Sequence, residues 1–417
     1  MGENGRPPGR QTVVMVTTSY PRFPGDTIGT FMEPIARGVA ERGHEVHVVL
    51  PWHPRLARGP VEHGIHFHPF RYAPLAGLYV FGYAGALRAD VRLRLSAYAV
   101  APIALIAGWR KARSVARASG ASVIHAHWVV PGGAIAAAGC PRLPLVVSLH
   151  GSDVYVAERS PIARRVAGVV LRRSGWVTSP SDDLRTRAIA LGAAPERSET
   201  VPYGVDTDRF RPDPAARARR RAALGLADAP LLFTAGRFVR KKGFEYLIDA
   251  AARLVPRWPA LRLVIGGGGD LEADLRERAV RQGIAEHVVF PGVLRHDEVA
   301  EFLAAADLIV VPSVRDDSGN VDGLPNVVME ALASGTALVT TAAGGIGAVA
   351  HDNWNAALVS ERDVEGLALR IAELLGSPDT RARLGGQARK DVIANHGWAR
   401  AAEAFERAYR QAGLPFK

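Results

Sequence analysis

The chain has 417 residues, of which 48% are hydrophobic and 22% charged, and this composition predicts a globular protein of two or three domains. Its single cysteine, Cys140, excludes a disulfide framework within the chain and is typical of a reducing compartment. The formal net charge of +11 leaves open a nucleic acid, an anionic membrane or an acidic substrate as partner. The longest apolar run, 97–109, is shorter than the roughly 20 residues that a membrane span needs.

Residues 1–10, MGENGRPPGR, are polar and rich in glycine and proline. They contain no apolar stretch of the kind found in a signal peptide, so we expect a loose N-terminal tail.

Residues 11–205 alternate between apolar, β-branched runs and helix-like segments. Strands are predicted at 11–18, 43–51, 121–127, 144–150, 176–180 and 198–203. Strands that alternate with helices indicate a parallel sheet covered on both faces, which makes this half an α/β domain.

The second half repeats the same alternation, which predicts a second α/β domain over 229–395. Its strands are predicted at 231–237, 261–267, 287–292, 307–313, 336–341 and 355–360, and its helices near 243–255, 270–282, 296–305, 326–334 and 363–375. We expect a turn-rich hinge at 206–228 and a C-terminal helix, 396–417, that packs back on the first domain. Ligands of doubly wound sheets bind at the carboxyl ends of the strands, so a cleft between the two domains is the expected site.

The strongest functional motif is PSVRDDSGNVDGLPNVVMEALASG, residues 312–335, in which a strand and a polar loop precede a helix that begins near Asn326. The free N–H groups and the dipole of such a helix start favour an anion such as a diphosphate. Asp322 and Glu330 flank this point, and carboxylates are good acceptors for sugar hydroxyls. Taken alone, the pair also fits a loop aspartate and a helix-surface glutamate.

A second motif, GRFVRKKG at 236–243, directly follows a predicted strand. Arg237 at the strand end and Lys242 before the next helix could clamp a diphosphate and stabilise a leaving group, although a solvated basic turn is the alternative. The chain has five lysines among its 52 basic residues, so the adjacent pair Lys241-Lys242 is unusual.

A third motif is the glycine-rich turn VIGGGGD, 264–270, whose glycines permit close approach of a ligand to the backbone. It is no dinucleotide fingerprint, because Leu271 stands at the third glycine position.

In the first half, the loop PRFPGDTIGTF at 21–31 contains Gly25 and Gly29 and could touch phosphates. The motif HGSD at 150–153 places His150 and Asp153 at the carboxyl end of a strand, although a histidine there is often structural. Two further patterns are discounted as metal sites: Asp206-Thr207-Asp208 follows no strand end, and His125-Ala126-His127 fits strand packing and lacks a carboxylate partner.

The order and spacing of these motifs over residues 11–400 resemble the retaining glycosyltransferases of family 4, which have the GT-B fold. The pieces that carry the resemblance are Gly29-Thr30-Phe31, ARGVAERGHEVHVVLP, His150-Gly151, VPYGVDTDRF, GRFVRKKG, the glycine-rich turn before Asp270, VVFPGVL and DGLPNVVMEALASG. The resemblance implies two Rossmann-like, doubly wound parallel-sheet domains that face each other across a cleft.

The resemblance also implies roles for individual residues. Arg237 and Lys242 would bind the donor diphosphate, Glu330 the ribose hydroxyls and Asp322 the donor sugar. Backbone amides of Gly323, Leu324, Pro325 and Asn326 would line the sugar and phosphate site, Gly266 would lie in the donor-side loop, Val293 and Leu294 near the nucleobase, His150 near the reacting carbon, Gly29 near the phosphates and Asp153 on the acceptor side.

One departure from the family is that Asp322 stands where a glutamate is usual. The shorter side chain could change the choice of sugar, or Asp322 could pair with its neighbours Asp316 and Asp317.

The implied reaction transfers a sugar from a UDP- or GDP-sugar to a lipid-linked or polysaccharide acceptor with retained configuration, without a cofactor or a metal. Transfer to a small-molecule acceptor is the alternative within the class. A phosphorylase or a sugar-nucleotide epimerase is the alternative within the fold. A nicotinamide-dependent oxidoreductase would need the complete glycine fingerprint, and a nucleic-acid-binding protein is suggested by the high pI alone.

The basic excess lies in one half of the chain. Residues 1–205 hold 24 Lys and Arg against 13 Asp and Glu, whereas residues 206–417 hold 28 of each. Seven basic residues surround the apolar run that ends in Trp109, namely Arg88, Arg92, Arg94, Arg110, Lys111, Arg113 and Arg117. Apolar residues with basic flanks favour a cytoplasmic enzyme that is peripheral on the anionic inner face of the plasma membrane; a buried helix with solvated arginines is the alternative.

Overall fold

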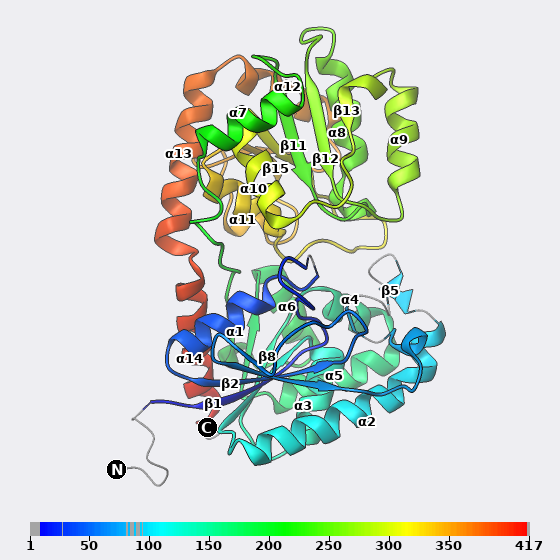
Figure 1. Ribbon diagram of the computed structural model, residues 1–417, viewed down its shortest axis with the longest axis vertical. Coiled ribbons are helices and arrows are strands. Elements are labelled where there is room, and N and C mark those ends of the chain that lie inside the picture. Colours follow the sequence, from blue (N-terminus) through cyan, green and yellow to red (C-terminus); the bar gives the residue numbers. More distant parts are fainter. Residues whose placement is uncertain are drawn as a thin grey trace. The chain divides into compact units, whose positions relative to one another are not determined.

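The structure is a computed structural model that describes residues 9–26, 28–80, 82–83, 87–88, 92–93 and 95–414; for residues 76, 87–88, 92–93 and 95–99 it describes the backbone alone. Most of the predicted N-terminal tail, residues 1–8, lies outside this description. The chain forms two compact units: unit 1 comprises Met1–Pro202 and Trp398–Lys417, and unit 2 comprises Tyr203–Gly397. In each unit, helices cover a central sheet (Figure 1).

Unit 1 contains an eight-stranded sheet in the order β10-β9-β8-β7-β1-β2-β4-β3, in which only β3 runs antiparallel to its neighbour. Its strands are β1 (Thr12–Val16), β2 (Glu45–Pro51), β3 (Val61–Glu62), β4 (Ile65–Phe70), β7 (Val123–His127), β8 (Leu145–Ser148), β9 (Trp176–Ser179) and β10 (Ser198–Thr200); β5 (Leu87–Arg88) and β6 (Arg92–Leu93) form a separate ribbon. The six strands predicted in this half are confirmed, and β3, β4, β5 and β6 are additional.

Strand β4 has a local pattern that explains its place beside β2. Ile65 and Phe67 are buried, and the histidines between and after them alternate to the other face with a period of two. His47 Nδ1 of β2 lies 3.0 Å from His68 Nε2, and the His47 ring stacks on that of His66 at 4.7 Å. Paired histidines thus line one face of the β2–β4 ladder, while the apolar side chains reach the core.

The helices of unit 1 include one from the far end of the chain. They are α1 (Met32–Glu41), α2 (Leu95–Ala118), α3 (Ala134–Gly139), α4 (Ser152–Arg159), α5 (Pro161–Arg173), α6 (Asp182–Leu191) and α14 (Trp398–Ala412). Helix α14 packs beside α1, and its Phe405 and Tyr409 are 4% and 1% exposed within the core of this unit. The Tyr409 hydroxyl also lies 2.8 Å from His125 Nδ1, so the C-terminal helix completes the core of unit 1.

Unit 2 contains a six-stranded, all-parallel sheet in the order β13-β12-β11-β14-β15-β16. Its strands are β11 (Leu231–Ala235), β12 (Arg262–Gly266), β13 (Val288–Val289), β14 (Leu308–Val311), β15 (Leu338–Thr341) and β16 (Ala357–Val359). Its helices are α7 (Pro214–Ala223), α8 (Phe244–Leu254), α9 (Glu272–Arg281), α10 (His296–Ala305), α11 (Asn326–Ser334), α12 (Val364–Leu375) and α13 (Pro378–Asn395). All six strands and all five helices predicted in this half are confirmed.

The segment predicted as a hinge, 206–228, is instead a packed part of unit 2. Its helix α7 packs against α10, and Arg217 and Arg221 both form ion pairs with Asp307, at 2.6 and 3.1 Å. Arg221 also donates hydrogen bonds to the carbonyl oxygens of Ala227 and Ala229. The arginines of this segment therefore anchor it, because a carboxylate and carbonyl groups in the same unit pair with them.

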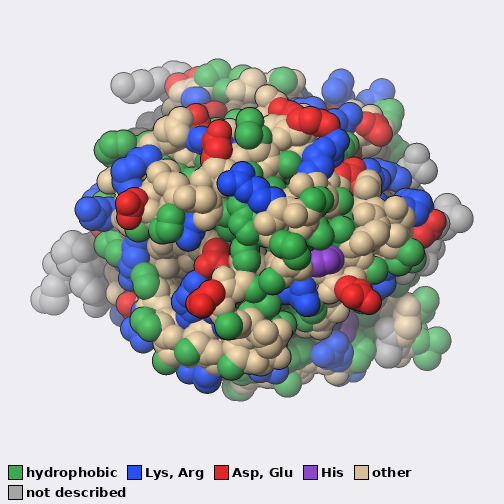
Figure 2. Space-filling model, turned by 90° about the horizontal axis from the view of Figure 1, so that it is seen from above, with side chains coloured by type: hydrophobic (Ala, Val, Ile, Leu, Met, Phe, Trp, Pro, Cys, Tyr) green, Lys and Arg blue, Asp and Glu red, His purple; other side chains and the backbone are tan. Residues whose placement is uncertain are grey.

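No helix in the part of the chain that the structure describes is long and apolar enough to cross a membrane. On the face shown in Figure 2, Lys and Arg side chains are interspersed with Asp and Glu side chains.

The contribution of α14 to unit 1 is tested by Phe405→Ala. Removal of a large aromatic side chain from a core costs about 3–5 kcal/mol, so we expect the free energy of unfolding of unit 1 to fall by that amount. Urea denaturation of the whole protein measures it, with the exposed Arg407 on the same helix as control. If Phe405→Ala unfolded at the same urea concentration as Arg407→Ala, α14 would not be part of the core.

Candidate functional site

The carboxyl edge of the unit 2 sheet has a topological switch point between β11 and β14. From β11 the chain adds β12 and β13 on one side, and then β14, β15 and β16 on the other. Loops that leave neighbouring strands at such a point diverge and leave room for a ligand. The two loops here are 236–243 and 312–325, which carry the two strongest sequence motifs.

These two loops are joined by a buried carboxylate that lies between two lysines. Lys241 and Lys242 belong to a single turn of 3-10 helix, Arg240–Lys242. Lys241 Nζ lies 2.9 Å from Asp322 Oδ1, and Lys242 Nζ lies 2.6 Å from Oδ2. Burial alone would raise the pKa of Asp322, but the two ammonium groups outweigh this effect and hold the pKa well below its usual range. Asp322 is therefore a charged carboxylate at any physiological pH.

Two glycines, Gly243 in the first loop and Gly344 in the loop after β15, allow the backbone to pack closely around this cluster. Gly243 has a φ of +65°, and a Cβ atom there would lie 2.0 Å from the carbonyl oxygen of Pro312. Gly344, with a φ of +62°, would place a Cβ atom 1.9 Å from the carbonyl oxygen of Asp322. Any larger residue would separate the backbones, so the ion pairs depend on both glycines.

Helix α11 begins beside this cluster with Pro325 as its N-cap, which supplies no side-chain hydrogen bond to the first turn. The predicted anion-binding helix start, with Gly323, Leu324 and Asn326 around it, is therefore at the switch point, next to Asp322.

Glu330 lies in the second turn of α11 and is 8% exposed, so it is no helix-surface glutamate. Burial raises the pKa of its carboxyl group to about 7, against the opposing effects of the cations Arg209 and Lys242. The motif thus holds two acids of different character: an ionised Asp322, and a Glu330 that changes protonation near neutral pH.

The glycine-rich turn lies against the GRFVRKKG loop. The N–H of Gly236 donates to the carbonyl oxygen of Gly266 at 2.9 Å, and the N–H of Phe238 donates to that of Gly268 at 2.9 Å. A Cβ atom on Gly266 would lie 2.6 Å from Leu294 Cδ1, so that glycine makes room for Leu294. The structure therefore brings the residues predicted for the donor phosphates and those predicted for the nucleobase onto adjoining loops.

Two of the predicted site residues on the loops of unit 2 have exposed side chains. Val293 is 67% exposed, and Arg237 is exposed directly after β11.

Two residues of this cluster were missed by the sequence analysis, Lys241 and Arg209. The unusual Lys-Lys pair was a signal for Lys241. Arg209 affects the carboxyl group of Glu330 from a distant position in the sequence, and no local pattern indicates that proximity.

In unit 1, His150 follows β8 and is enclosed by aromatic rings. Its ring centroid lies 4.4 Å from that of Trp128 and 4.8 Å from that of Phe31, and its Nε2 lies 3.1 Å from Nδ1 of His127. Burial lowers the pKa of His150 to about 3, so the imidazole is neutral at physiological pH. It is suited to a neutral hydrogen bond and unsuited to acid catalysis.

Asp153 does not have the arrangement expected of an acceptor-binding residue. It is 3% exposed, its Oδ2 accepts from the N–H of Val129 at 2.7 Å, and its Oδ1 accepts from the N–H groups of His150 and Gly151 at 3.2 and 3.0 Å. We therefore correct the prediction: Asp153 is buried against the backbone and accepts the N–H groups of Val129, His150 and Gly151.

Gly29 precedes α1 with a φ of +66°, and a Cβ atom there would lie 2.7 Å from Ser19 Oγ. The glycine is thus required by the fold of the loop, whether or not it also contacts a ligand. The structure places Gly29, His150 and Asp153 in unit 1 and the other predicted site residues in unit 2.

The two patterns discounted as metal sites have structural partners. His125 is fully buried and lies 2.7 Å from Ser148 Oγ through its Nε2, and His127 pairs with His150. Asp206 Oδ1 accepts from the N–H groups of Asp208 and Arg209 within a turn. Among the described residues, no group of three His, Cys, Asp or Glu side chains could hold a metal ion.

The suggested pairing of Asp322 with its acidic neighbours is wrong. Asp316 accepts hydrogen bonds from Ser318 and Asn320 within its own loop, and Asp317 pairs with Arg362. The lysines of the GRFVRKKG loop are the partners of Asp322 instead.

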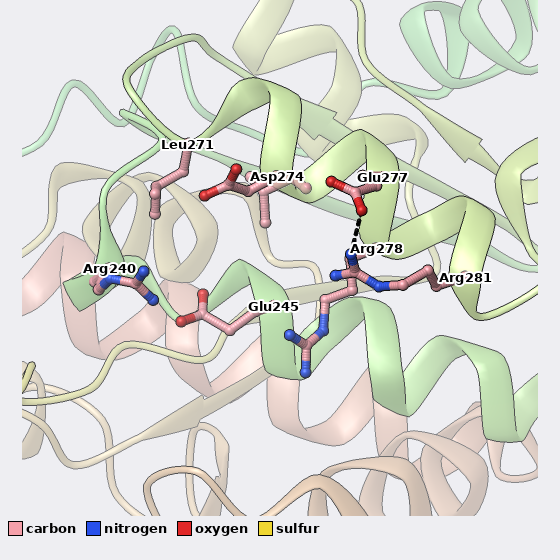
Figure 3. A pocket seen from close by; sticks show the side chains of 8 residues that line it. Arg240, Glu245, Leu271, Asp274, Glu277, Arg278 and Arg281 are labelled. Carbon is pink, nitrogen blue, oxygen red and sulfur yellow. Dashed lines mark hydrogen bonds and ion pairs between the residues drawn. The ribbon is translucent and has the colours of Figure 1, made fainter.

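A pocket of about 300 Å³ lies elsewhere in unit 2, beside α9 (Figure 3). Its lining is Arg240, Glu245, Leu271, Asp274, Leu275, Glu277, Arg278 and Arg281. Glu277 and Arg281 pair with each other one turn apart on α9, and none of the predicted site residues lines the pocket.

Two family descriptions match the chain. "Glycosyl transferases group 1" matches residues 217–391, and "Glycosyltransferase Family 4" matches residues 28–209. The chain is 35% identical to the "GDP-mannose-dependent alpha-(1-6)-phosphatidylinositol monomannoside mannosyltransferase" of Mycolicibacterium smegmatis over 262 residues, which are 63% of this chain and 68% of that protein. It is 29% identical to the "D-inositol 3-phosphate glycosyltransferase" of Acidothermus cellulolyticus over 97% of this chain and 91% of that protein.

Solved structures share the fold. Sucrose-phosphate synthase from Thermosynechococcus elongatus superposes with a TM-score of 0.77 at 20% identity, covering 96% of this chain and 99% of that one. The two parallel-sheet α/β units therefore define the GT-B class. The chain belongs to the family 4, group 1 glycosyltransferases, as the motif resemblance indicated.

The raised pKa of Glu330 predicts a pH-dependent stability. The folded state keeps the proton up to about pH 7 whereas an unfolded glutamate, with an ordinary pKa of 4.5, loses it earlier. Stability contributed by this group should therefore fall as the pH rises from 4.5 to 7 and stay constant above. Because one pKa unit corresponds to about 1.4 kcal/mol, Glu330→Gln should gain about 2–3 kcal/mol relative to the wild type between pH 4.5 and 8.

Urea denaturation of the wild type and of Glu330→Gln at both pH values measures this gain. Glu286→Gln, at an exposed position, is the control and should show no such change. A Glu330→Gln difference that is the same at both pH values would contradict the buried, titrating carboxyl group.

Proposed function

We propose that the chain transfers a sugar from a nucleotide-sugar donor, with Lys242, Arg237 and the start of α11 receiving the donor diphosphate. The observation that carries the proposal is the Asp322–lysine cluster at the switch point of the unit 2 sheet, where a cationic turn and a helix N-terminus meet. Both features favour a dianionic group, and the glycine-rich turn with Leu294 beside it offers a surface for the base.

In the proposed reaction, the bond between the anomeric carbon and the diphosphate oxygen breaks, and a bond to an acceptor hydroxyl forms on the same face of the sugar. The acceptor's proton passes to the departing phosphate. The electron pair of the broken bond stays on the diphosphate, so catalysis needs cations at that position, and Lys242 and Arg237 supply them. Glu330 would accept hydrogen bonds from the ribose hydroxyls, and Asp322 would contact the donor sugar. We propose that no metal takes part, because the lysine and arginine provide the positive charge.

The names of the relatives guide the choice of substrates. The M. smegmatis relative is named for GDP-mannose and a phosphatidylinositol mannoside, so we propose a GDP- or UDP-sugar, with GDP-mannose first, as donor and a lipid-linked or polysaccharide glycan of the cell envelope as acceptor. A small-molecule acceptor is the alternative, and an assay of sugar transfer to both kinds of acceptor distinguishes them.

A basic and apolar face of α2 supports the proposal that the enzyme works at a membrane surface. Ile103 and Ile106 are 56% and 45% exposed, and Arg110, Arg113 and Arg117 continue the same face with spacings of three and four residues. Among the described residues, none of these arginines forms an ion pair. Exposed isoleucines beside unneutralised arginines suit the interface of an anionic leaflet. Arg88, Arg92 and Arg94, which belonged to the same prediction, have side chains outside the described part.

The donor proposal is tested with nucleoside diphosphates and nucleotide sugars. GDP or UDP should raise the melting temperature of the wild type, because a ligand of the folded state stabilises it. Lys242→Ala and Arg237→Ala should each lower the rate of sugar transfer by about 10²–10³, as does loss of a group that stabilises charge in a transition state.

Assays run in EDTA should retain full activity. Lys390→Ala removes an exposed lysine elsewhere in unit 2 and is the control. A wild type that no nucleotide stabilises, or an activity that EDTA abolishes and a divalent ion restores, would contradict the proposal.

The membrane proposal is tested by flotation with vesicles of anionic or neutral lipid at low salt. A basic side chain near an anionic surface contributes about 1 kcal/mol, so Arg110→Gln combined with Arg113→Gln should weaken binding to anionic vesicles at least ~10-fold. Arg400→Gln with Arg407→Gln removes the same charge from α14 and should bind as the wild type does. Equal binding to neutral and anionic vesicles would contradict this surface.

A further inference from the structure

We propose that Lys241 is a positioning residue for the donor diphosphate: it neutralises Asp322, so that the positive charge of Lys242 remains available to the phosphates. This inference rests on the proposed function and adds a residue to which neither the motifs nor the relatives assign a role.

The geometry fixes Lys241 against Asp322. Residue Lys241 is 9% exposed, its Nζ is 2.9 Å from Asp322 Oδ1, and its backbone carbonyl accepts the N–H of Val314 at 2.9 Å. The other carboxylate oxygen, Oδ2, contacts Lys242 Nζ at 2.6 Å. Each oxygen thus has one ammonium group, and both lysines come from the same 3-10 turn.

The count of charges gives this arrangement a consequence. Two ammonium groups and one carboxylate leave the cluster with a net charge of +1. Without Lys241, the Asp322–Lys242 pair would carry no net charge, and the site would offer a diphosphate one positive charge fewer. Because the groups are largely removed from water, a change of one charge has a larger effect here than on an exposed surface.

The same count predicts opposite effects for the two partners. Lys241→Met lowers the charge of the cluster to zero, and Asp322→Asn raises it to +2. The double variant returns it to +1, with Lys242 as its single cation. If Lys241 had a purely structural role, Asp322→Asn would not restore nucleotide binding to Lys241→Met, because the second substitution would destabilise the loops further.

The experiment measures the dissociation constants of GDP and UDP by isothermal titration calorimetry at low salt, for the wild type, both single variants and the double variant. We expect Lys241→Met to weaken binding about 10-fold, Asp322→Asn to strengthen it about 10-fold, and the double variant to bind within about 3-fold of the wild type; a tenfold change corresponds to about 1.4 kcal/mol. Lys390→Met is the matched control for the loss of an exposed lysine and should bind as the wild type does. Circular dichroism of each variant checks that it is folded.

Two results would overturn the inference. One is Lys241→Met binding GDP and UDP as tightly as the wild type, and the other is weak binding that Asp322→Asn fails to reverse in a folded double variant. A wild type that binds neither GDP nor UDP would contradict the proposed function itself. This result is distinguishable from a failure of the Lys241 inference, in which the wild type still binds the nucleotides.

Discussion

The contact between Asp322 and the two lysines is the interaction on which the site depends. It joins the loop after β11 to the loop after β14, the two strands between which the order of the unit 2 sheet reverses. Gly243 lets these two loops approach each other, and Gly344, in the loop after β15, lies against the backbone of Asp322; a side chain at either position would collide with a backbone oxygen. The start of α11 is positioned by the same contact, since Asp322 lies just before the helix.

Burial affects the ionisable groups of the protein differently according to the charges around them. Asp322 and Glu330 are both removed from water, but two direct cations keep the first ionised, whereas the second faces weaker attractions and has a raised pKa. Burial, together with the neighbouring His125, lowers the pKa of His150 and leaves its imidazole neutral. The surroundings of these three groups therefore set their charge states. Asp322 is ionised, Glu330 titrates near pH 7 and the imidazole of His150 is neutral.

The fold could be predicted from the sequence because buried parallel strands appear as apolar, β-branched runs, and the carboxyl ends of such strands locate the loops that bind ligands. Candidate site residues that lie in a single loop or at a helix start, such as Lys242, Asp322 and Glu330, could be located in this way. Contacts between distant segments could not be predicted from such patterns. The contact of Lys241 with Asp322, the proximity of Arg209 to Glu330 and the backbone hydrogen bonds of Asp153 all depend on tertiary structure. The packing of segment 206–228 within unit 2 was not predicted either, because its arginines find their partner, Asp307, some 90 residues away in the sequence.

The most direct test of this account is a crystal structure of the protein with a bound nucleoside diphosphate. The account predicts a phosphate oxygen within about 3 Å of Lys242 Nζ and beside the first N–H groups of α11, with Asp322 still on Lys241 and the ribose at Glu330. A nucleotide bound elsewhere, such as in the pocket beside α9, or phosphates remote from Lys242, would contradict it.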